Sequence, residues 1–423
     1  MNSLIITTIF LLFFPIWVRF QGKDAITTGS IAIILSFFVF LIHALLTKKV
    51  KFHFLIIMLL LIIVATISAN SISPQFLGPS FRGYAQFVCA LLAFFMVTNH
   101  YYDLPLYKRQ KGIESILSYI IVLFVIQVII GTILYYYPSF GYYLKIFTTR
   151  TEDVFATPIA SGVKRLHGII VAQETFGEIL AMLMPLVLYK IIKKEWPYYF
   201  VYGIFAVGVV LSATRSSIFL FFVGSLIFII INWKLVKLPA WLIPLYIITL
   251  AAIIFYFYTP HAFDPIFNRF TLFFDLYEKT RSITIAIDRK TLWDIAVQEV
   301  FTKLNLFGHG MITVIANQQF SIHNLFLTVL FQMGIVGFVL FFGLMGKIFI
   351  SLITSLKYIQ NPYDRCLLIS SIISLVIFLL SEMKCEFNRG SSYQQIVWIL
   401  LGIYYLAAMT LREKQLINNT RTS

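Results

Sequence analysis

Charged residues are scarce in this sequence. Asp, Glu, Lys and Arg make up 12% of its 423 residues and hydrophobic residues make up 60%, whereas soluble domains usually carry about 25% charge. Mean hydropathy is high, at +0.88. Apolar runs of about 18 residues or more, the length that crosses a bilayer, recur along the whole chain. These features exclude a soluble enzyme and predict one all-α polytopic membrane domain over residues 1–423.

Cysteine is also rare, and the common cofactor motifs are absent. Cys89 and Cys366 lie in apolar segments and Cys385 lies in a loop, with neither metal-ligand spacing nor a disulfide framework. The sequence has no Walker-type glycine loop and no GxGxxG, HExxH or CxxC motif, and its long polar loops contain no Asp-x-Asp pair. We therefore expect no cofactor, no metal site and no nucleic-acid partner. The net charge of +15 is interpreted as membrane topology and attraction to anionic lipid.

Twelve apolar segments predict about twelve transmembrane helices. The first follows Met1 without a basic n-region or a cleavage site, so it is expected to be a retained helix. The polar tail from Glu413 is expected to be frayed. The predicted spans are 3–20, 27–46, 53–71, 83–99, 115–137, 169–189, 198–213, 216–232, 239–258, 324–350, 366–382 and 394–411.

Basic residues in the short loops predict the orientation, because such residues stay in the cytoplasm. Arg19, Lys23 and Arg82 lie on the opposite side and count mildly against this orientation. Six clusters each follow an even-numbered span and therefore share one side, as do both termini: Lys48/Lys49/Lys51, Lys108/Arg109/Lys111, Lys190/Lys193/Lys194, Lys234/Lys237, Lys357/Arg365 and Arg412/Lys414.

The other side holds two long loops, a smaller one at 138–168 and a large one at 259–323. The segment from Arg289 to Leu304 has apolar residues at helical spacing, which predicts an amphipathic helix within the large loop. Both loops carry basic residues that the positive-inside rule does not require. This excess of positive charge on the outer side is a candidate functional feature.

Two arginines stand at element boundaries on that side. Leu211 to Ser217 is a polar break between two spans, and its Arg215 either snorkels to water or presents a guanidinium fork that binds phosphate oxygens. Arg289 begins the predicted loop helix, where it either pairs with a neighbouring acid on the surface or contributes to a site.

His323 lies where the large loop enters the tenth span. It is either an interfacial histidine with a backbone partner or a general base that accepts a proton from a hydroxyl group. Upstream, Phe307 to Gly310 is typical of a tight turn that returns the chain to the bilayer.

Further polar residues flank the spans on the same side. Lys164 and Arg165 precede the sixth span, which opens with Glu174 and Glu178, one helical turn apart on one face. These glutamates either pair with a loop arginine or include a catalytic carboxylate, and their role stays open. Arg389 belongs to a short polar loop that either contacts a substrate or is simply solvated.

Three segments, in this order, resemble the bacterial O-antigen ligase and O-antigen polymerase superfamily, whose members transfer glycans carried on undecaprenyl diphosphate. Thr214 to Ser216 resembles its Ser/Thr-Arg-Ser/Gly corner. Arg289, Trp293 and Phe307 to Gly310 resemble the Arg…Trp…Gly-x-Gly run of its large periplasmic loop. His323 to Leu327, followed by Gly334 to Gly337, resembles its His-Asn-x-aromatic-Leu…Gly-x-x-Gly signature.

The resemblance covers roughly residues 160–345. Arg165 to Gly168 is also similar to an Arg-x-x-Gly element that precedes the sixth span in the family. Gln173 and Glu174 depart from the Pro-Asn or Asn-Ala pair of many members, which leaves the role of that span open.

The resemblance implies a fold of the helical membrane glycosyltransferase type, in the bacterial inner membrane, with a metal-independent active site facing the periplasm. Arg215 and Arg289 would bind the diphosphate, His323 would activate the acceptor hydroxyl, and Lys164, Arg165, Asn324 and Arg389 would bind substrate. The implied partners are an undecaprenyl-diphosphate-linked oligosaccharide, an acceptor glycan or the lipid A core, membrane lipid and a chain-length regulator.

Two branches of the family and one other class stay open. A polymerase extends the lipid-linked chain, whereas a ligase moves the finished chain to the lipid A core. Arg289 and His323 are 34 positions apart, a compact spacing that favours a polymerase. A flippase or transporter is the alternative from another class, but such proteins often show internal repeats and none is visible here.

Overall fold

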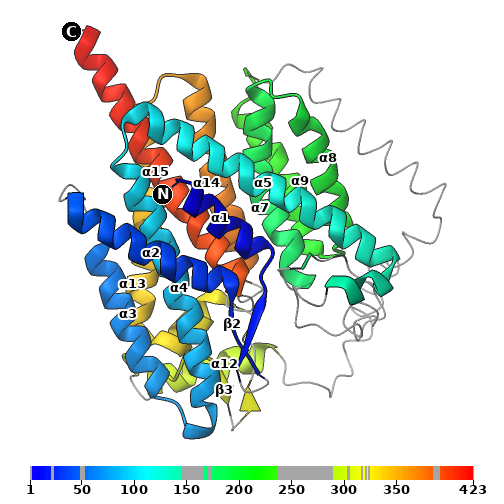
Figure 1. Cartoon of the computed structure of the whole chain (residues 1–423), viewed down its shortest axis with the longest axis vertical. Helices are drawn as coiled ribbons and strands as arrows, with labels where there is room; N and C mark the ends of the chain where they lie inside the picture. Colours follow the sequence, from blue (N-terminus) through cyan, green and yellow to red (C-terminus); the bar gives the residue numbers. More distant parts are fainter. Residues whose placement is uncertain are drawn as a thin grey trace.

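The computed structural model describes residues 2–20, 23–47, 53–144, 166, 168–169, 173–235, 289–302, 305–315, 318–319, 322, 324–383 and 391–422. Over these residues the chain forms a bundle of helices with two small β-hairpins (Figure 1). Seven of the described helices are long and apolar enough to cross a membrane, and four shorter apolar helices accompany them. The predicted fold class, an all-α polytopic membrane protein, is therefore confirmed.

The N-terminal part of the chain begins with a helical hairpin. Helices α1 (Asn2–Phe13) and α2 (Thr28–Thr47) are joined by an antiparallel pair of strands, β1 (Trp17–Phe20) and β2 (Lys23–Thr27). The predicted first span, 3–20, is wrong beyond Phe13, because Pro15 has no N–H to continue a helix and the next residues pair as a strand. A helix of 12 residues rises only about 18 Å, less than the hydrocarbon thickness of about 30 Å.

The remaining elements agree closely with the predicted spans. Ten further spans coincide with helices, and the span predicted at 239–258 lies outside the described residues, so the total of twelve stays a prediction. The elements are α3 (Leu55–Asn70), α4 (Leu77–Tyr102), α5 (Leu106–Tyr136), α7 (Gln173–Ile192), α8 (Pro197–Leu211), α9 (Arg215–Ile231), α12 (Arg289–Thr302), β3 (Val314–Ile315), β4 (Gln318–Gln319), α13 (Leu325–Leu356), α14 (Pro362–Glu382) and α15 (Ser391–Thr422), with short 3-10 turns at Pro74–Phe76 and Pro138–Leu144.

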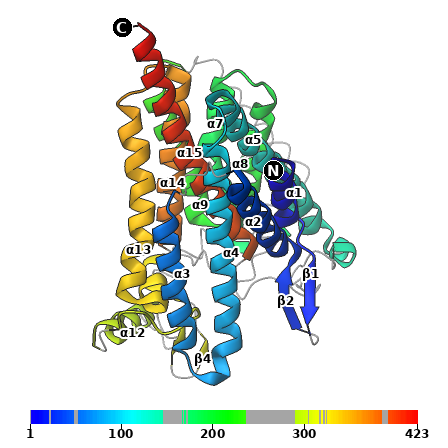
Figure 2. The same ribbon diagram turned by 60° about the vertical axis from the view of Figure 1, so that its left-hand side comes forward.

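Two helices form the centre of the bundle. The membrane-length window of α7 is buried along its whole length and that of α15 almost completely, whereas α2 leaves most of its apolar surface open. Helix α7 packs between α14, α9 and α8, and α15 packs along α4 (Figure 2). The apolar outer surface of such a bundle is matched to lipid, whereas buried polar side chains face the interior and are distributed over most of the helices.

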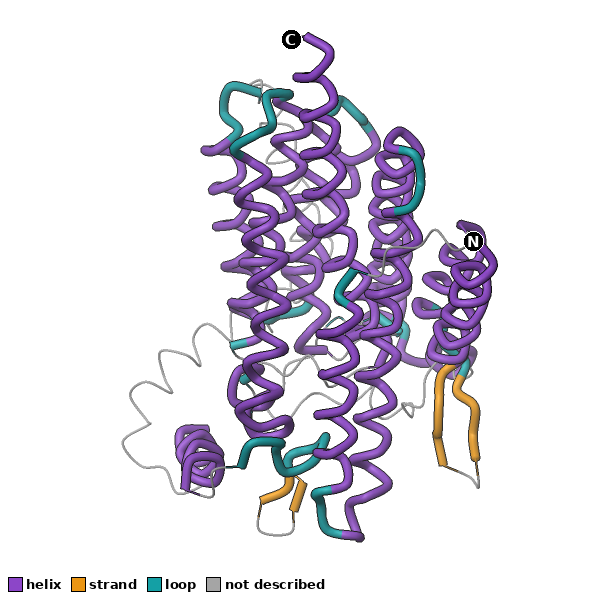
Figure 3. The backbone as a smooth tube through the Cα atoms, turned by 90° about the vertical axis from the view of Figure 1, so that its left-hand side faces the viewer, coloured by secondary structure: helices purple, strands orange, loops and turns teal. Residues whose placement is uncertain are grey.

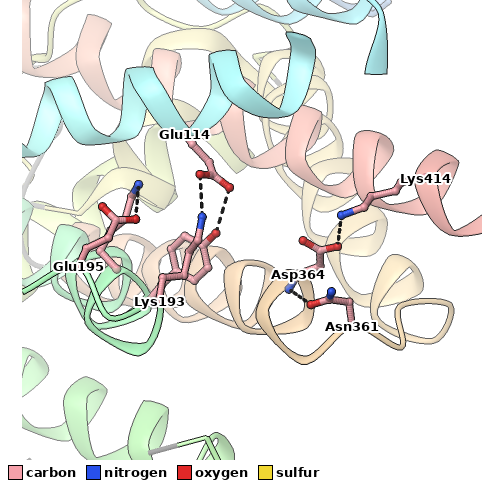
Figure 4. A network of polar contacts seen from close by, with 8 residues as sticks. Glu114, Lys193, Glu195, Asn361, Asp364 and Lys414 are labelled. Atoms are coloured by element: carbon pink, nitrogen blue, oxygen red, sulfur yellow. Dashed lines mark hydrogen bonds and ion pairs between the residues drawn. The ribbon is translucent and has the colours of Figure 1, made fainter. Parts of the chain in front are cut away.

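One end of the bundle gathers the basic residues that the sequence assigned to the cytoplasm (Figure 4). Lys193 at the end of α7 pairs with Glu114 of α5 at 2.8 Å, and Lys414 of α15 pairs with Asp364 of α14 at 2.6 Å. Arg109, buried at the start of α5, pairs with Glu413 at 2.7 Å. We call this the basic end. Residues from the second, third, fifth and sixth predicted clusters meet there, as the predicted orientation requires.

The same ion pairs correct the expectation for the C-terminal tail. Helix α15 continues through Glu413 to Thr422. Glu413 and Lys414 are held by partners on α5 and α14, so the first turn of the tail is part of the bundle.

The opposite end is defined by α12 and residues 305–315, and we call it the loop end (Figure 3). Helix α7 ends at the basic end, next to Lys193. Helix α13 also ends there, next to Tyr358, whose ring lies under the guanidinium of Arg412. Both helices therefore begin at the loop end. Helix α8 starts at the basic end next to Lys190 and Glu195, so α9, which follows it, starts at the loop end.

Candidate functional site

The structure describes only some of the predicted site residues. Lys164, Arg165, His323 and Arg389 lie outside the described residues. Arg215 and Arg289 are described as the first residues of α9 and α12, but their side chains are not. Asn324 is described in full. The site is therefore built from the backbone and side chains immediately around these positions.

The corner between α8 and α9 places Arg215 at the loop end. Ala213 has a positive φ of 50° and Thr214 is extended, so the chain reverses within two residues before α9 begins. Ser212 and Ser217 are fully buried on either side of Arg215. A left-handed alanine is strained, which shows that the surrounding packing holds this corner in shape.

Two other segments pack against the corner. The N–H of Leu166 donates to the carbonyl of Leu211 at 2.9 Å, so the residue that follows Arg165 lies beside the end of α8. Gly177 of α7 fits so closely that a Cβ there would lie 2.3 Å from Ser212 Oγ and 2.9 Å from Ser217 Cβ. The fold thus brings Leu166, the first turns of α7 and the corner between α8 and α9 together.

A buried amide anchors the segment that follows Arg165. Gln127 of α5 accepts from the N–H of Ile169 at 2.8 Å and donates to the carbonyl of Phe13 at 3.0 Å. Burial of a polar side chain is tolerated when its hydrogen bonds are satisfied. Gln127 therefore fixes the chain at the entrance to α7 to two other helices.

Three helices at the loop end begin at or shortly after an arginine or a histidine. Asp288 directly precedes Arg289 in the sequence. Helices α9 and α12 start at Arg215 and Arg289, and His323 precedes Asn324, the N-cap of α13. None of these helices has an acidic residue in its first turn. The positive end of a helix dipole disfavours cations and favours anions. A basic residue there becomes favourable when an anion binds beside it.

The turn predicted at Phe307 to Gly310 is confirmed, and it is fastened to α13. Asn305 organises it by accepting from the N–H groups of Phe307 at 3.1 Å and Gly308 at 2.8 Å. His309 N–H donates to the carbonyl of Phe331 at 3.0 Å, and Val336 N–H donates to the carbonyl of Leu306 at 3.1 Å. The turn therefore satisfies backbone groups of α13 that a straight helix would have bonded internally.

Gly334 makes that junction possible. It interrupts α13 with φ 67° and ψ −171°, a conformation open to glycine and strained for other residues. A Cβ on Gly334 would lie 2.4 Å from the carbonyl oxygen of Leu306, and one on Gly308 would lie 2.0 Å from that of Gln332. Gly308 and Gly334, which come from two different motifs, therefore allow the same close contact between the turn and α13.

The helix of the large loop is seated on the same junction. The indole N–H of Trp293 on α12 donates to the carbonyl of Ile322 at 2.8 Å, next to His323 in the chain. Ala296 and Val300 of α12 are buried against Ile322 and Phe331. The predicted amphipathic helix is confirmed from Arg289 to Thr302, whereas Leu304 lies outside the described residues. Helix α12 and Ile322 therefore belong to one packed unit with the first half of α13.

The contact between Trp293 and Ile322 can be tested with Trp293→Phe. The change removes a side-chain donor to the carbonyl of Ile322, a fully buried residue. Leaving such a group unsatisfied costs about 1–3 kcal/mol. We expect a lower melting temperature of the purified protein and faster proteolysis between α12 and α13. Trp233→Phe, at a largely exposed position, is the control, and equal behaviour of both variants would contradict this role of Trp293.

Sequence reasoning missed two serines in the first half of the chain. Ser68 of α3 accepts from Gly310 N–H at 3.1 Å and donates to the carbonyl of Gln332. Ser80 of α4 accepts from Met311 N–H at 3.0 Å and donates to the carbonyl of Ala69 at 3.2 Å. They lie in spans that match the family only in hydropathy. Their signal was a hydroxyl residue within an apolar run, which is common and carries little information alone.

Asn324, which the sequence predicts to bind substrate, has a structural role at the start of α13. Its side chain is nearly buried and its Oδ1 accepts from the N–H of Leu327 at 3.2 Å, which caps α13. Within the described ranges, no three His, Cys, Asp or Glu side chains gather closely enough to hold a metal ion. The expectation of a metal-free site stays a prediction.

Comparison with known proteins agrees with the resemblance drawn from the motifs. Residues 199–342 match the O-antigen ligase family. This segment, about a third of the chain, contains Arg215, Arg289, His323 and the Gly334 junction. No curated protein matches the chain. Members of this family are enzymes of the glycosyltransferase or ligase type. Over residues 199–342 the chain is thus similar to the O-antigen ligase family.

Proposed function

We propose that this protein is the polymerase of a bacterial surface polysaccharide, such as O-antigen or capsule. It would lie in the inner membrane with its loop end in the periplasm and extend a glycan held on undecaprenyl diphosphate. The observation that carries the proposal is the coincidence of the family match with the two helices, α9 and α12, that begin with an arginine. A diphosphate is the anion that such helix starts and arginines would hold.

In this proposal Arg215 and Arg289 bind the diphosphate of the donor. Charge develops on the leaving oxygen as the bond between the sugar and the phosphate breaks, and fixed guanidinium groups stabilise it. Lys164 and Arg165 would add contacts from the segment that is hydrogen-bonded to the end of α8. Arg389, in the polar loop that follows α14, would complete the binding surface.

His323 would act on the acceptor. In the sequence it directly precedes Asn324, the N-cap of α13. A neutral imidazole can accept the proton of the acceptor hydroxyl as its oxygen bonds to the anomeric carbon. The sugar–phosphate bond breaks and undecaprenyl diphosphate leaves. Because Asn324 Oδ1 caps the helix, a contact of Asn324 with substrate would be made through Nδ2.

A ligase is the second candidate, since the matching family is described as O-antigen ligase. A ligase would use the same donor and transfer its glycan to the lipid A core. The compact spacing of Arg289 and His323, 34 positions, favours the polymerase. A chain-length regulator would be a partner only of the polymerase. A transporter would often show internal repeats, and none is visible in the sequence.

A deletion strain separates the two branches. Loss of a polymerase should leave a single repeat unit attached to the lipid A core, because ligation still works. Loss of a ligase should leave long polymer on undecaprenyl diphosphate. We expect the first pattern on a lipopolysaccharide gel, with recovery of the ladder when the intact gene is returned. Accumulated lipid-linked polymer would contradict the polymerase assignment.

Metal dependence gives a separate test of the diphosphate site. If arginines neutralise the leaving diphosphate, the activity of the purified protein should be unchanged in excess EDTA. The measurement is polymer formed from lipid-linked repeat units with and without EDTA. A requirement for added Mg²⁺ or Mn²⁺ would show that arginines alone do not account for the chemistry.

A further inference from the structure

Helix α13 is interrupted near the loop end, and its two halves depend on outside support. Gly334 leaves helical geometry and separates a first half, residues 325–333, from a longer second half. The hydrogen bonds that make a helix rigid are broken at this point, since Val336 N–H donates to the carbonyl of Leu306 instead. The first half begins after the N-cap Asn324. Contacts from other segments must therefore set its position.

Helix α3 provides a continuous support that runs past the break. It packs along α13 and has no interruption of its own. On one side of the break, a Cβ on Gly337 would lie 3.2 Å from Val64 Cγ1. On the other side, the hydroxyl of Ser68, one helical turn further along α3, donates to the carbonyl of Gln332. One unbroken helix therefore contacts α13 on both sides of Gly334.

The same hydroxyl also holds the turn of the large loop. Ser68 Oγ accepts from the N–H of Gly310 at 3.1 Å. The turn lies directly on α3, because a Cβ on Gly310 would be 2.8 Å from Ile72 Cδ1. A serine hydroxyl has one proton to donate and lone pairs that accept, and the completely buried Ser68 uses both. Its single oxygen atom joins α3, the turn and the first half of α13.

We propose that Ser68 is a positioning residue for glycan transfer, which fixes the turn and the first half of α13 against the membrane-spanning bundle. This inference rests on the proposed function. Helix α12 packs on the first half of α13, so a displacement of that half also displaces α12. A misplacement of about 1 Å far from the chemistry can lower a rate by a factor on the order of 10². Ser68 lies outside residues 199–342, so the inference adds a functional residue beyond the family match.

Ser80 of α4 offers a matched comparison for the loss of buried hydrogen bonds. It is completely buried like Ser68, accepts from Met311 N–H at 3.0 Å and donates to the carbonyl of Ala69 at 3.2 Å. Each serine thus serves one backbone donor and one backbone acceptor. Neither of these two partners of Ser80 belongs to α13. A difference between the two serines therefore reports on the link to α13.

The test measures turnover per folded molecule for Ser68→Ala and Ser80→Ala. The full-length variants are purified in nanodiscs, bound undecaprenyl diphosphate counts the folded sites, and polymer formed from lipid-linked repeat units gives kcat. We expect Ser68→Ala to bind with wild-type stoichiometry and to lose roughly 10- to 100-fold in kcat. Ser80→Ala should lower the melting temperature by a similar amount but keep more of the kcat.

Two further variants complete the set. Ser68→Cys fills the same space with a weak donor, so it should also lose kcat while it disturbs the packing less than alanine. Ser71 lies at the end of the same helix, is exposed, and donates its hydroxyl to the carbonyl of Ile67 at 2.9 Å within α3. Ser71→Ala should therefore match the wild type in both binding and kcat.

Hydrogen exchange shows the displacement directly. Residues 305–315 and 325–333 should exchange faster in Ser68→Ala than in the wild type, whereas the second half of α13 should not change. Wild-type kcat in Ser68→Ala, equal loss of kcat in Ser68→Ala and Ser80→Ala, or activity that falls only in proportion to the number of binding sites would overturn the inference alone. If the wild type forms no polymer from lipid-linked repeat units, the proposed function fails and the inference fails with it.

Discussion

Arg215→Ala should abolish polymer formation while the protein is still made and inserted. Arg215 begins α9 at the loop end, behind a corner whose buried serines and strained Ala213 hold its backbone in one place. Removal of one preorganised donor to developing negative charge costs about 10²–10³ in rate, and loss of an arginine that neutralises a leaving phosphate costs more, about 10³–10⁵. The measurement is the ladder of chain lengths in a deletion strain that expresses the variant.

Two variants make this result interpretable. Arg215→Lys keeps the charge but loses the planar fork, so it should retain a weak ladder. Arg82→Ala removes an exposed arginine near the loop-end start of α4, outside the proposed site, and should leave a normal ladder. Equal expression of all three is checked by immunoblot of the membrane fraction. A full ladder from Arg215→Ala would remove Arg215 from the mechanism.

Gly308→Ala should destabilise the protein more than any other single methyl group added at the loop end. Gly308 has φ 88°, and a Cβ there would lie 2.0 Å from the carbonyl oxygen of Gln332. Backbone strain and overpacking of this kind each cost about 1–3 kcal/mol, so a loss of about 3 kcal/mol or more is expected. Separation of the turn from α13 should also displace His323 and lower activity. Thermal unfolding of the purified protein measures the effect.

Gly346→Ala is the matched control. Gly346 lies on the same helix, α13, and a Cβ there would meet no atom within 4 Å. Alanine is the better helix former by about 1 kcal/mol, so this variant should be as stable as the wild type or more stable. If Gly308→Ala and Gly346→Ala unfold at the same temperature, the junction between the turn and α13 does not support the structure as described.

The sequence predicted the helices well because their signal is local. Apolar length and loop charge are properties of short segments, so spans such as 324–350 and 366–382 appear at their places as α13 and α14. The first span failed beyond Phe13 because hydropathy does not register Pro15 or the pairing of β1 with β2.

The site was predicted only in part, because its contacts join segments that are distant in the sequence. The glycines of the Phe307 to Gly310 turn and Gly334 were visible as motifs. Their mutual contact depends on a fold that brings Gly308 and Gly334, 26 positions apart, together. Ser68 and Ser80 contribute from distant spans and carry no sequence pattern of their own.

The most direct test of the proposed function is reconstitution from defined components. The purified protein in nanodiscs is given a lipid-linked repeat unit on undecaprenyl diphosphate as its only substrate, and products are separated by length. The account predicts a ladder of longer lipid-linked glycans and release of undecaprenyl diphosphate, both lost in Arg215→Ala and His323→Ala. Absence of any ladder until a lipid A core acceptor is added, followed by transfer to that acceptor, would contradict it.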